Sequence, residues 1–364
     1  MPSHLPTIAR SVDLSSMSNP CAWSLTDLES VPQNGLKVMS TFSCGGGSSM
    51  GYKLAGCTLV GANDIDPEMQ AAYTLNLHPA SYYLCPIGDL LKQDLPDELF
   101  HLDILDGSPP CSTFSMSGDR EKDWGKKKHF REGQTEQVLS DLFFDYLDLV
   151  ERLRPRVAIA ENVAGLLRGN AKGYVRLIVD RFRTIGYKVQ CFLIDAADCG
   201  VPQHRERTFF TALRDDIEKP KLILQPKMPW VSAAEACADL QQLTAEEIEQ
   251  TRPAPSAIRL WPYLGKGCDF FSAHEVLGER PTQFNQSRLD GDKPSCTITS
   301  CVTQNQYHWN ECRKLTMREL IRLGSFPDNY QFRSRSRAGY LIGMSVPPRM
   351  MQFVAGEVTR QWLT

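Results

Sequence analysis

A cysteine and a glutamate are the residues in this chain best suited to covalent chemistry. Cys111 follows two prolines in the segment DGSPPCSTFSMSG, and Glu161 begins the segment ENV directly after the apolar run Val157–Ala160. A thiolate is a strong nucleophile near neutral pH, and the prolines restrict the direction in which it points. A carboxyl group at an apolar strand end can stay protonated and act as an acid. A lone cysteine is more often part of a core and such a glutamate can cap a helix, so the pair is a hypothesis.

Two arginines lie close together in QHRER, at residues Gln203–Arg207. Alternate residues of an extended segment point the same way, so Arg205 and Arg207 share a face. Their planar donor groups suit paired contacts with carboxylates, phosphates or base edges.

A nucleoside site is indicated by three further segments. The glycine-rich turn TFSCGGGSSMG (Thr41–Gly51) follows the first apolar run and lets a ligand approach the backbone at a helix N-terminus. Asp64 ends the next run and can bind ribose hydroxyls, and Asp89 can accept from an adenine amino group. Asp66 can instead cap a helix that begins at Pro67. NAD and S-adenosylmethionine both remain possible at this point.

The elements that must position these residues follow a strand-then-helix rhythm. Helical patterns separate most of the apolar runs, as in Gln134–Leu153, which predicts an α/β protein with a mostly parallel sheet covered on both sides. The last two runs are joined without room for a helix, so we expect an antiparallel pair at the end of the sheet. The runs are Lys37–Phe42, Thr58–Ala62, Leu102–Leu105, Val157–Ala160, Val189–Ile194 and Thr208–Leu213.

Composition changes divide the chain into four parts. Residues 1–34 are rich in serine and proline and are expected to form a flexible tail. Residues 35–214 carry the strand-and-helix rhythm, and residues 215–331, rich in proline, tryptophan and acidic residues, are expected to form a second domain. Residues 332–364 are expected to return to the first domain and to end in a helix at Pro348–Leu363.

Composition also excludes several classes of protein. The 364 residues contain no apolar run near the roughly 20 needed to cross a bilayer and no N-terminal signal pattern, so we expect a cytoplasmic protein. The twelve cysteines include no C-x-x-C pair and the histidines lack zinc-like spacing, so no metal is expected. A net charge of −3 argues weakly against nucleic acid, but the stretch Arg120 to Arg131 is basic.

Taken in order, these motifs resemble the cytosine carbon-5 DNA methyltransferases. FSxGGG, AND, GD, SPPCSxFS, ENV and QxRxR occur in that family's sequence, and LTMRELIRLGSFPDNY and GMSVPP resemble its closing motifs. The resemblance covers residues 36 to 364 except the middle of the second domain, and the GGGSSMGYKLAG and STFS variants are most similar to phage and prophage enzymes. It implies a Rossmann-like S-adenosylmethionine-dependent fold, with a seven-stranded mostly parallel sheet and a smaller target-recognition domain.

The resemblance also assigns roles. Cys111 would attack carbon 6 of a flipped-out cytosine, Glu161 would engage nitrogen 3 and the amino group, Arg207 would bind the base oxygen and Arg205 would support the site. The implied contacts with S-adenosylmethionine are Phe42, Ser43, Gly46, Asp64, Ile65, Asp89, Pro110, Leu142 and Ser345. The expected DNA contacts are Ser115, Arg120, Lys126, Lys127, Lys128 and Gln203, most of them in a basic loop that would close over phosphates.

Two positions depart from the family pattern. Cys44 stands where the family usually has glycine, and Met344 replaces the asparagine of G-N-S-V-P-P. The second departure puts one cofactor contact in doubt.

Other functions remain open from the sequence. An RNA cytosine methyltransferase and a catalytically silent DNA-binding relative share the expected architecture, whereas a nicotinamide dehydrogenase would not need the Cys111 and Glu161 pair. We expect a monomer that acts on double-stranded DNA, with no membrane partner. The recognised DNA sequence and the existence of a cognate restriction endonuclease cannot be read from the residues.

Overall fold

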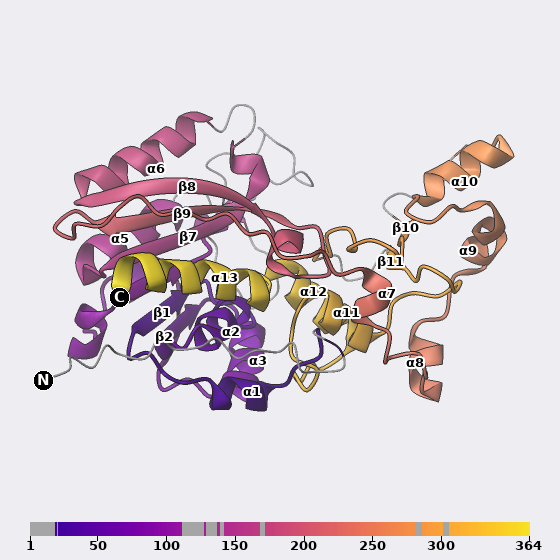
Figure 1. The fold of residues 1–364 in the computed structure, drawn as a ribbon, viewed down its shortest axis with the longest axis horizontal. Coiled ribbons are helices and arrows are strands. Elements are labelled where there is room, and N and C mark those ends of the chain that lie inside the picture. The colour runs from indigo at the N-terminus through magenta and orange to yellow at the C-terminus, as the bar shows by residue number, and fades with distance from the viewer. Residues whose placement is uncertain are drawn as a thin grey trace, which may run out of the picture.

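The protein has two lobes of unequal size (Figure 1). The computed structural model describes residues 19, 21–110, 142–167, 172–280, 286–300 and 306–364, and the backbone of residues 127–128 and 137–138. The larger lobe contains a twisted sheet between layers of helices, and the smaller lobe carries α7 to α10.

Among the described residues, seven strands form one sheet in the order β3-β2-β1-β4-β7-β9-β8. The first five are parallel, and β9 runs antiparallel to both β7 and β8. The mostly parallel sheet and its terminal antiparallel pair are therefore confirmed, although the short β3 was not among the expected runs. The strands are β1 (Lys37–Thr41), β2 (Thr58–Asp64), β3 (Tyr82–Leu84), β4 (Ile104–Gly107), β7 (Val157–Val163), β8 (Tyr187–Asp195) and β9 (Glu206–Arg214).

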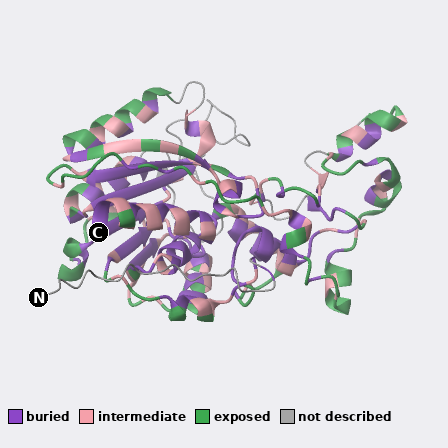
Figure 2. Cartoon of the chain, in the orientation of Figure 1, coloured by how far each residue is buried: buried purple, intermediate pink, exposed green. Residues whose placement is uncertain are grey.

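Alternating side chains of these strands supply two separate cores. Met39 and Leu105 pack on one face of the sheet with α5 (Leu142–Leu153) and α6 (Lys172–Thr184). Their neighbours Val38 and Ile104 point the other way and pack with α13 (Pro348–Val358). Strands covered on both faces read as continuous apolar runs, which is why they were visible in the sequence. Figure 2 shows the central strands of the sheet largely buried, whereas the edge strand β8 is mostly intermediate or exposed.

The remaining helices and short strands complete both lobes. They are α1 (Leu25–Ser30), α2 (Gly47–Leu54), α3 (Pro67–Leu77), α4 (Ile87–Leu90), η2 (Asp97–His101), η3 (Ala164–Leu167), η5 (Ala196–Cys199), α7 (Ala233–Ala236), α8 (Ala245–Gln250), α9 (Pro255–Leu260), η6 (Trp261–Tyr263), α10 (Phe270–Leu277), β10 (Ser287–Arg288), β11 (Gln306–Tyr307), α11 (Met317–Leu323), α12 (Arg335–Met344) and η7 (Thr359–Leu363). The expected final helix is thus present as α13 followed by η7. None of the helices within the described residues is long and apolar enough to cross a membrane.

Two sequence expectations about elements were wrong. The helix expected from Gln134 starts only at Leu142 in the described residues, and β6 (Gln137–Val138) instead pairs antiparallel with β5 (Lys127–Lys128). Backbone pairing with β5 gives these two residues partners that a helix would otherwise supply.

The expected flexible tail is folded over residues 21–34, and only its earlier part lies outside the described residues. Helix α1 begins after a capping box at Ser24, and Trp23 is buried with its indole N–H donating to the Ser325 carbonyl oxygen at 3.1 Å. A long-range contact with a large aromatic residue fixes this segment in spite of its polar composition.

The smaller lobe has a core of its own. Leu260, Leu264, Phe270 and Tyr307 form a small buried cluster separate from those of the sheet. We propose the remaining domain boundaries at residues 214 and 331.

Candidate active site

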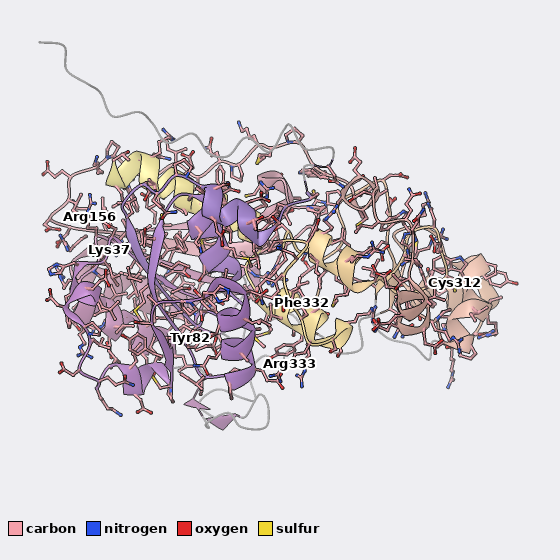
Figure 3. The ribbon with its side chains drawn as sticks, turned by 90° about the horizontal axis from the view of Figure 1, so that it is seen from below. Lys37, Tyr82, Arg156, Cys312, Phe332 and Arg333 are labelled. Atoms are coloured by element: carbon pink, nitrogen blue, oxygen red, sulfur yellow. The ribbon has the colours of Figure 1, made fainter. Side chains whose placement is uncertain are left out.

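The sequence-predicted site residues of β1, β2, β4 and β7 lie at or just beyond the carboxyl ends of these strands. These strands run parallel and in register, so Thr41, Asn63, Gly107 and Ala160 lie level with one another. Figure 3 shows Lys37 and Arg156, at the opposite ends of β1 and β7, far from Cys312 in the smaller lobe. The carboxyl rim of the sheet therefore faces the smaller lobe. Ligands of open α/β sheets bind at this rim.

Glu161 and Arg207 form an ion pair at this rim. Glu161 is 8% exposed, and its Oε1 lies 2.8 Å from Arg207 Nε. The antiparallel register of β7 and β9 pairs Val163 with Arg207 and so brings the guanidinium beside the carboxylate. Burial lowers the pKa of Arg207, and the Glu161 carboxylate opposes this shift. The pair can present a carboxyl group and a guanidinium to one ligand.

The segment that leads to Cys111 is fixed beside this pair. The Asn162 side-chain amide donates to the Pro109 carbonyl oxygen at 3.0 Å, and the Thr41 hydroxyl donates to the Asp106 carbonyl oxygen at 2.9 Å. Cys111 itself lies outside the described residues, as do Ser115, Arg120 and Lys126 and the side chains of Lys127 and Lys128. The described part ends at Pro110, one residue before the expected nucleophile.

Asp106 is a buried acid within β4 that was not identified from the sequence. Its carboxylate accepts from the Ser40 hydroxyl at 2.7 Å and from the Tyr52 hydroxyl at 3.1 Å, and it is buried. Burial raises the pKa of Asp106 to about 7 in spite of these two bonds. No local pattern identifies such a residue, because its partners come from β1 and α2.

Arg205 and Gln203 do not reach the rim. Arg205 is buried and donates to the carbonyl oxygens of Ile298 at 3.0 Å and Gly343 at 2.7 Å. The expectation that Gln203 contacts DNA conflicts with its position, because it is buried and bonded to the Ile298 N–H and the Leu323 carbonyl oxygen, each at 3.0 Å. The Gln203 side chain, which we expected to contact DNA, instead connects the segment just before β9 to Ile298 and Leu323.

The glycine-rich turn follows β1 in left-handed backbone conformations. Cys44 has φ +46° and Gly46 has φ +81°, which explains why glycine is usual at position 44. Asp64 fixes the turn, since its carboxylate accepts from the backbone N–H groups of Cys44 at 2.8 Å and Asp66 at 3.0 Å. Burial raises the pKa of Asp64, and these backbone bonds oppose the shift. The expected cap is also present, because the Asp66 carboxylate accepts from Glu68 N–H at 2.8 Å.

A small, partly open cleft lies between the glycine-rich turn and the end of α12. A Cβ atom on Gly47 would lie 2.2 Å from the Val346 carbonyl oxygen, so only glycine allows the two backbones to meet. Met344 is 46% exposed and lines this cleft. The lining residues are Phe42, Ser43, Cys44, Gly47, Ser48, Ser108, Met344, Ser345 and Val346.

The residues that line the cleft are chemically suited to S-adenosylmethionine. Serine hydroxyls and the N-terminus of α2 suit the carboxylate of the methionine end. Asp64 keeps acceptor sites beyond its two backbone bonds and lies beside the same turn, where a ribose would need them.

The other expected cofactor residues are more scattered. Asp89 is exposed on α4 and pairs with Lys92 at 3.2 Å, whereas Leu142 is buried in the core at the start of α5. Tyr82 is a residue that the sequence reasoning missed. Tyr82 is in β3, and its hydroxyl lies 3.4 Å from the Ser43 hydroxyl of the glycine-rich turn (Figure 3).

A cleft at the carboxyl rim of a mostly parallel sheet, in a molecule that also carries a buried carboxylate–guanidinium pair at this rim, is typical of a Rossmann-like enzyme. The family model for C-5 cytosine-specific DNA methylase matches residues 36–360. The chain therefore belongs to the C-5 cytosine-specific DNA methylases. Its reaction is methyl transfer to carbon 5 of cytosine in DNA, and S-adenosyl-L-methionine is the methyl donor. RNA methylation, a silent relative and a dehydrogenase are not favoured by this match.

Individual relatives agree with the family. The type II methyltransferase M.NgoPII of Neisseria gonorrhoeae is 27% identical over 90% of this chain and 96% of its own length. M.NgoFVII of the same organism is 30% identical over 86% of this chain and 83% of its own length. A crystal structure of a DNA modification methyltransferase from an E. coli prophage shares the fold, with a TM-score of 0.69, 19% identity and coverage of 90% of this chain and 99% of that chain.

Proposed function

We propose that this chain methylates a cytosine flipped out of double-stranded DNA, through a covalent bond between Cys111 and carbon 6 of the base. The observation that carries this proposal is the arrangement at the rim. Asn162 holds the SPP segment that leads to Cys111, and Glu161, the residue before Asn162, is paired with Arg207. The segment that leads to Cys111 is thus held near this carboxyl group and guanidinium, and Cys111 would join them where strands β4, β7 and β9 meet.

The chemistry explains why three groups are needed. Carbon 5 of cytosine is a weak nucleophile until the Cys111 sulfur bonds to carbon 6 and pushes an electron pair toward carbon 5. Glu161 would stabilise that electron distribution by engaging nitrogen 3 and the amino group, and Arg207 would bind the base oxygen. Base flipping would bring the ring to this site at a cost of a few kcal/mol.

The cofactor supplies an electrophilic methyl group on a sulfonium sulfur. Carbon 5 would take that methyl group, after which loss of its proton and expulsion of the Cys111 thiolate restore the aromatic ring. Phe42, Ser43, Gly46, Asp64 and Ser345 would hold the cofactor, with Ile65, Asp89, Pro110 and Leu142 around it.

The DNA would lie between the two lobes. Ser115, Arg120, Lys126, Lys127 and Lys128 would contact it from the loop that follows Cys111, binding phosphates without reading sequence. The enzyme would act in the cytoplasm as a monomer, and a cognate restriction endonuclease would need the same recognition sequence.

Incubation with methyl-labelled S-adenosylmethionine and either duplex DNA or RNA tests the substrate. Label should enter duplex DNA only, and bisulfite sequencing of DNA from a host that expresses the protein should show protected cytosines in one sequence context. Label in RNA, or DNA protection without a fixed context, would contradict the proposal.

A further inference from the structure

The cofactor cleft meets the segment 298–300 at Gly343. This segment lies in the chain between β10 and β11 of the smaller lobe, and its Ile298 packs against helices of the larger lobe. A Cβ atom on Gly343 would lie 2.4 Å from the Thr299 carbonyl carbon and 2.5 Å from the Ser300 nitrogen. The two backbones are therefore in contact, with no side chain between them. The next two residues after Gly343 are Met344 and Ser345, which line the cleft.

Arg205 ties the same two segments together. One guanidinium nitrogen donates to the Ile298 carbonyl oxygen at 3.0 Å and the other donates to the Gly343 carbonyl oxygen at 2.7 Å. The guanidinium is planar and rigid, so a shift of either carbonyl breaks a bond and leaves a buried donor unpaired. Arg205 also stands two residues before Arg207, the partner of Glu161.

We propose that Arg205 couples cofactor binding to DNA binding by linking the cleft segment 343–345 to the smaller-lobe segment 298–300. A cofactor that orders Met344 and Ser345 also orders Ile298 and its neighbours, and DNA held by the smaller lobe orders the cleft in return. This inference rests on the proposed function, because it takes duplex DNA as the ligand of the smaller lobe. Arg205 acts here as a positioning residue and touches neither ligand.

Gln203 provides a matched control. It binds the same residue of the smaller lobe, since its side-chain oxygen accepts from the Ile298 N–H, but its other bond goes to Leu323 in α11. Leu323 does not line the cleft. A Gln203→Leu substitution removes a contact between the lobe and the sheet without cutting the link to the cofactor cleft.

Calorimetric titration with S-adenosylhomocysteine, the spent donor, measures the coupling. The affinity is determined for the protein alone and for the protein saturated with a duplex carrying the site found by bisulfite sequencing. Wild type should bind at least about fivefold more tightly in the presence of duplex, the lower end of ordinary coupling between sites. Arg205→Lys keeps the charge but loses the two-point contact, so its ratio should fall below about twofold, while Gln203→Leu should keep the wild-type ratio.

An unchanged ratio in Arg205→Lys, or no coupling in wild type, overturns the inference. If circular dichroism shows that Arg205→Lys is unfolded, Gly343→Ala takes its place, because the added methyl group forces the same two segments apart. Retained coupling in that variant also overturns the inference. A wild-type protein that methylates duplex DNA without coupling leaves the proposed function standing, whereas one that neither binds nor methylates duplex DNA contradicts both.

Discussion

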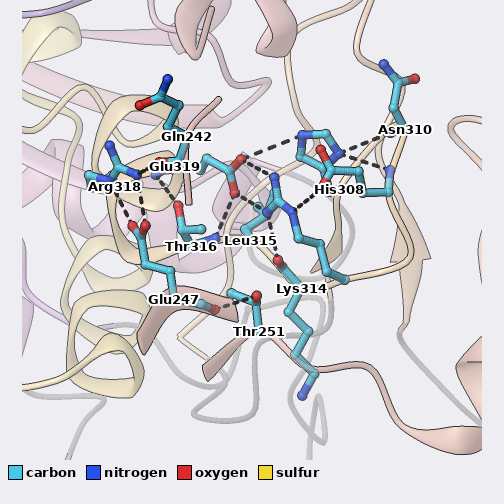
Figure 4. A network of polar contacts seen from close by, with 12 residues as sticks. Gln242, Glu247, Thr251, His308, Asn310, Lys314, Leu315, Thr316, Arg318 and Glu319 are labelled. Carbon is cyan, nitrogen blue, oxygen red and sulfur yellow. Dashed lines mark hydrogen bonds and ion pairs between the residues drawn. The ribbon is translucent and has the colours of Figure 1, made fainter. Parts of the chain in front are cut away.

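Two buried glutamates, one in each half of the molecule, are held by arginines in very different ways. Glu161 is bonded at Oε1 to Arg207 at the rim of the sheet. Glu319 accepts two bonds from Arg313, each 2.8 Å long, and a third from the Thr316 N–H at 2.7 Å, and it faces His308 (Figure 4).

This difference suggests different roles for the two residues, catalytic for Glu161 and structural for Glu319. Both oxygens of Glu319 are engaged within a capping box and an ion pair, so the residue fixes α11 to the preceding segment. Glu161 lies near the carboxyl end of β7, beside the segment that leads to the proposed nucleophile Cys111, and its only ion pair within the described residues is with Arg207. We therefore propose that similar pairs of residues serve chemistry at the sheet and architecture around α11.

The same contrast runs through neighbouring arginines. Arg318 pairs with Glu247 in α8 at 2.7 Å, and Arg322 is buried between Asp239 and Asp328. Both arginines are thus neutralised by carboxylates within the chain.

Replacing Glu161 should have the largest effect on activity. Glu161→Gln can still accept from Arg207 but cannot supply a proton, so methyl transfer should fall by about 10² to 10⁴-fold. Turnover with labelled cofactor measures this, with thermal unfolding as a check that the fold persists. Activity within tenfold of wild type would assign Glu161 to structure.

The matched variant Glu319→Gln should affect stability instead. It removes one of the two carboxylates that hold the buried Arg313, the other being Glu311, so the expected cost is about 1–3 kcal/mol. Urea unfolding at neutral pH measures the loss, and activity per folded molecule should stay within a few-fold of wild type. A loss below about 1 kcal/mol would show that the network is dispensable.

His308 should make the smaller lobe sensitive to acid. Burial, with repulsion from Arg313, lowers the pKa of His308 to about 4, while the unfolded chain has a value near 6.5. The unfolded state then takes up the proton first, so stability is complete above about pH 6.5 and declines as the pH falls toward 4.

The size of this decline is about 2 kcal/mol at pH 5, from a difference of about 1.5 pH units below the unfolded value. His308→Asn keeps an acceptor for the Asn310 and Glu311 N–H groups but cannot be protonated. Urea unfolding of both proteins between pH 7 and pH 5 compares the slopes. Equal slopes of unfolding free energy against pH would show that His308 does not cause the sensitivity to acid.

The smallest effect is expected at Met344. Met344→Asn restores the family residue in the cleft, and the cofactor affinity should change by no more than about tenfold, or roughly 1.4 kcal/mol. Calorimetric titration with S-adenosylmethionine measures it. A hundredfold change would show that Met344 defines the cleft.

The catalytic half could be predicted from sequence because its order is regular. Buried parallel strands give continuous apolar runs, and their carboxyl ends carry Asp64, Cys111 and Glu161 in local motifs. Asp66 and Pro67 likewise announce the start of α3. Each of these signals lies within a few residues of the group that it positions.

Other features could not be predicted, because they depend on contacts between distant residues. The sequence suggests that Gln203 is an exposed polar side chain, because its partners Ile298 and Leu323 are distant in the chain. The sequence around Trp23 does not indicate that its indole N–H donates to the Ser325 carbonyl oxygen. Asp106 becomes a buried acid only when Ser40 and Tyr52 are brought to it.

The proposed mechanism requires Cys111 to form a covalent bond with carbon 6 of a cytosine in duplex DNA. A duplex with 5-fluorocytosine at the target tests it most directly, because fluorine cannot leave as a proton does and the adduct is trapped after methyl transfer. Mass spectrometry of wild-type protein should find one DNA adduct, located on Cys111, that requires S-adenosylmethionine and is absent from Cys111→Ser, a variant that still binds DNA. An adduct that persists in Cys111→Ser, or methyl transfer by that variant at near the wild-type rate, would contradict the account.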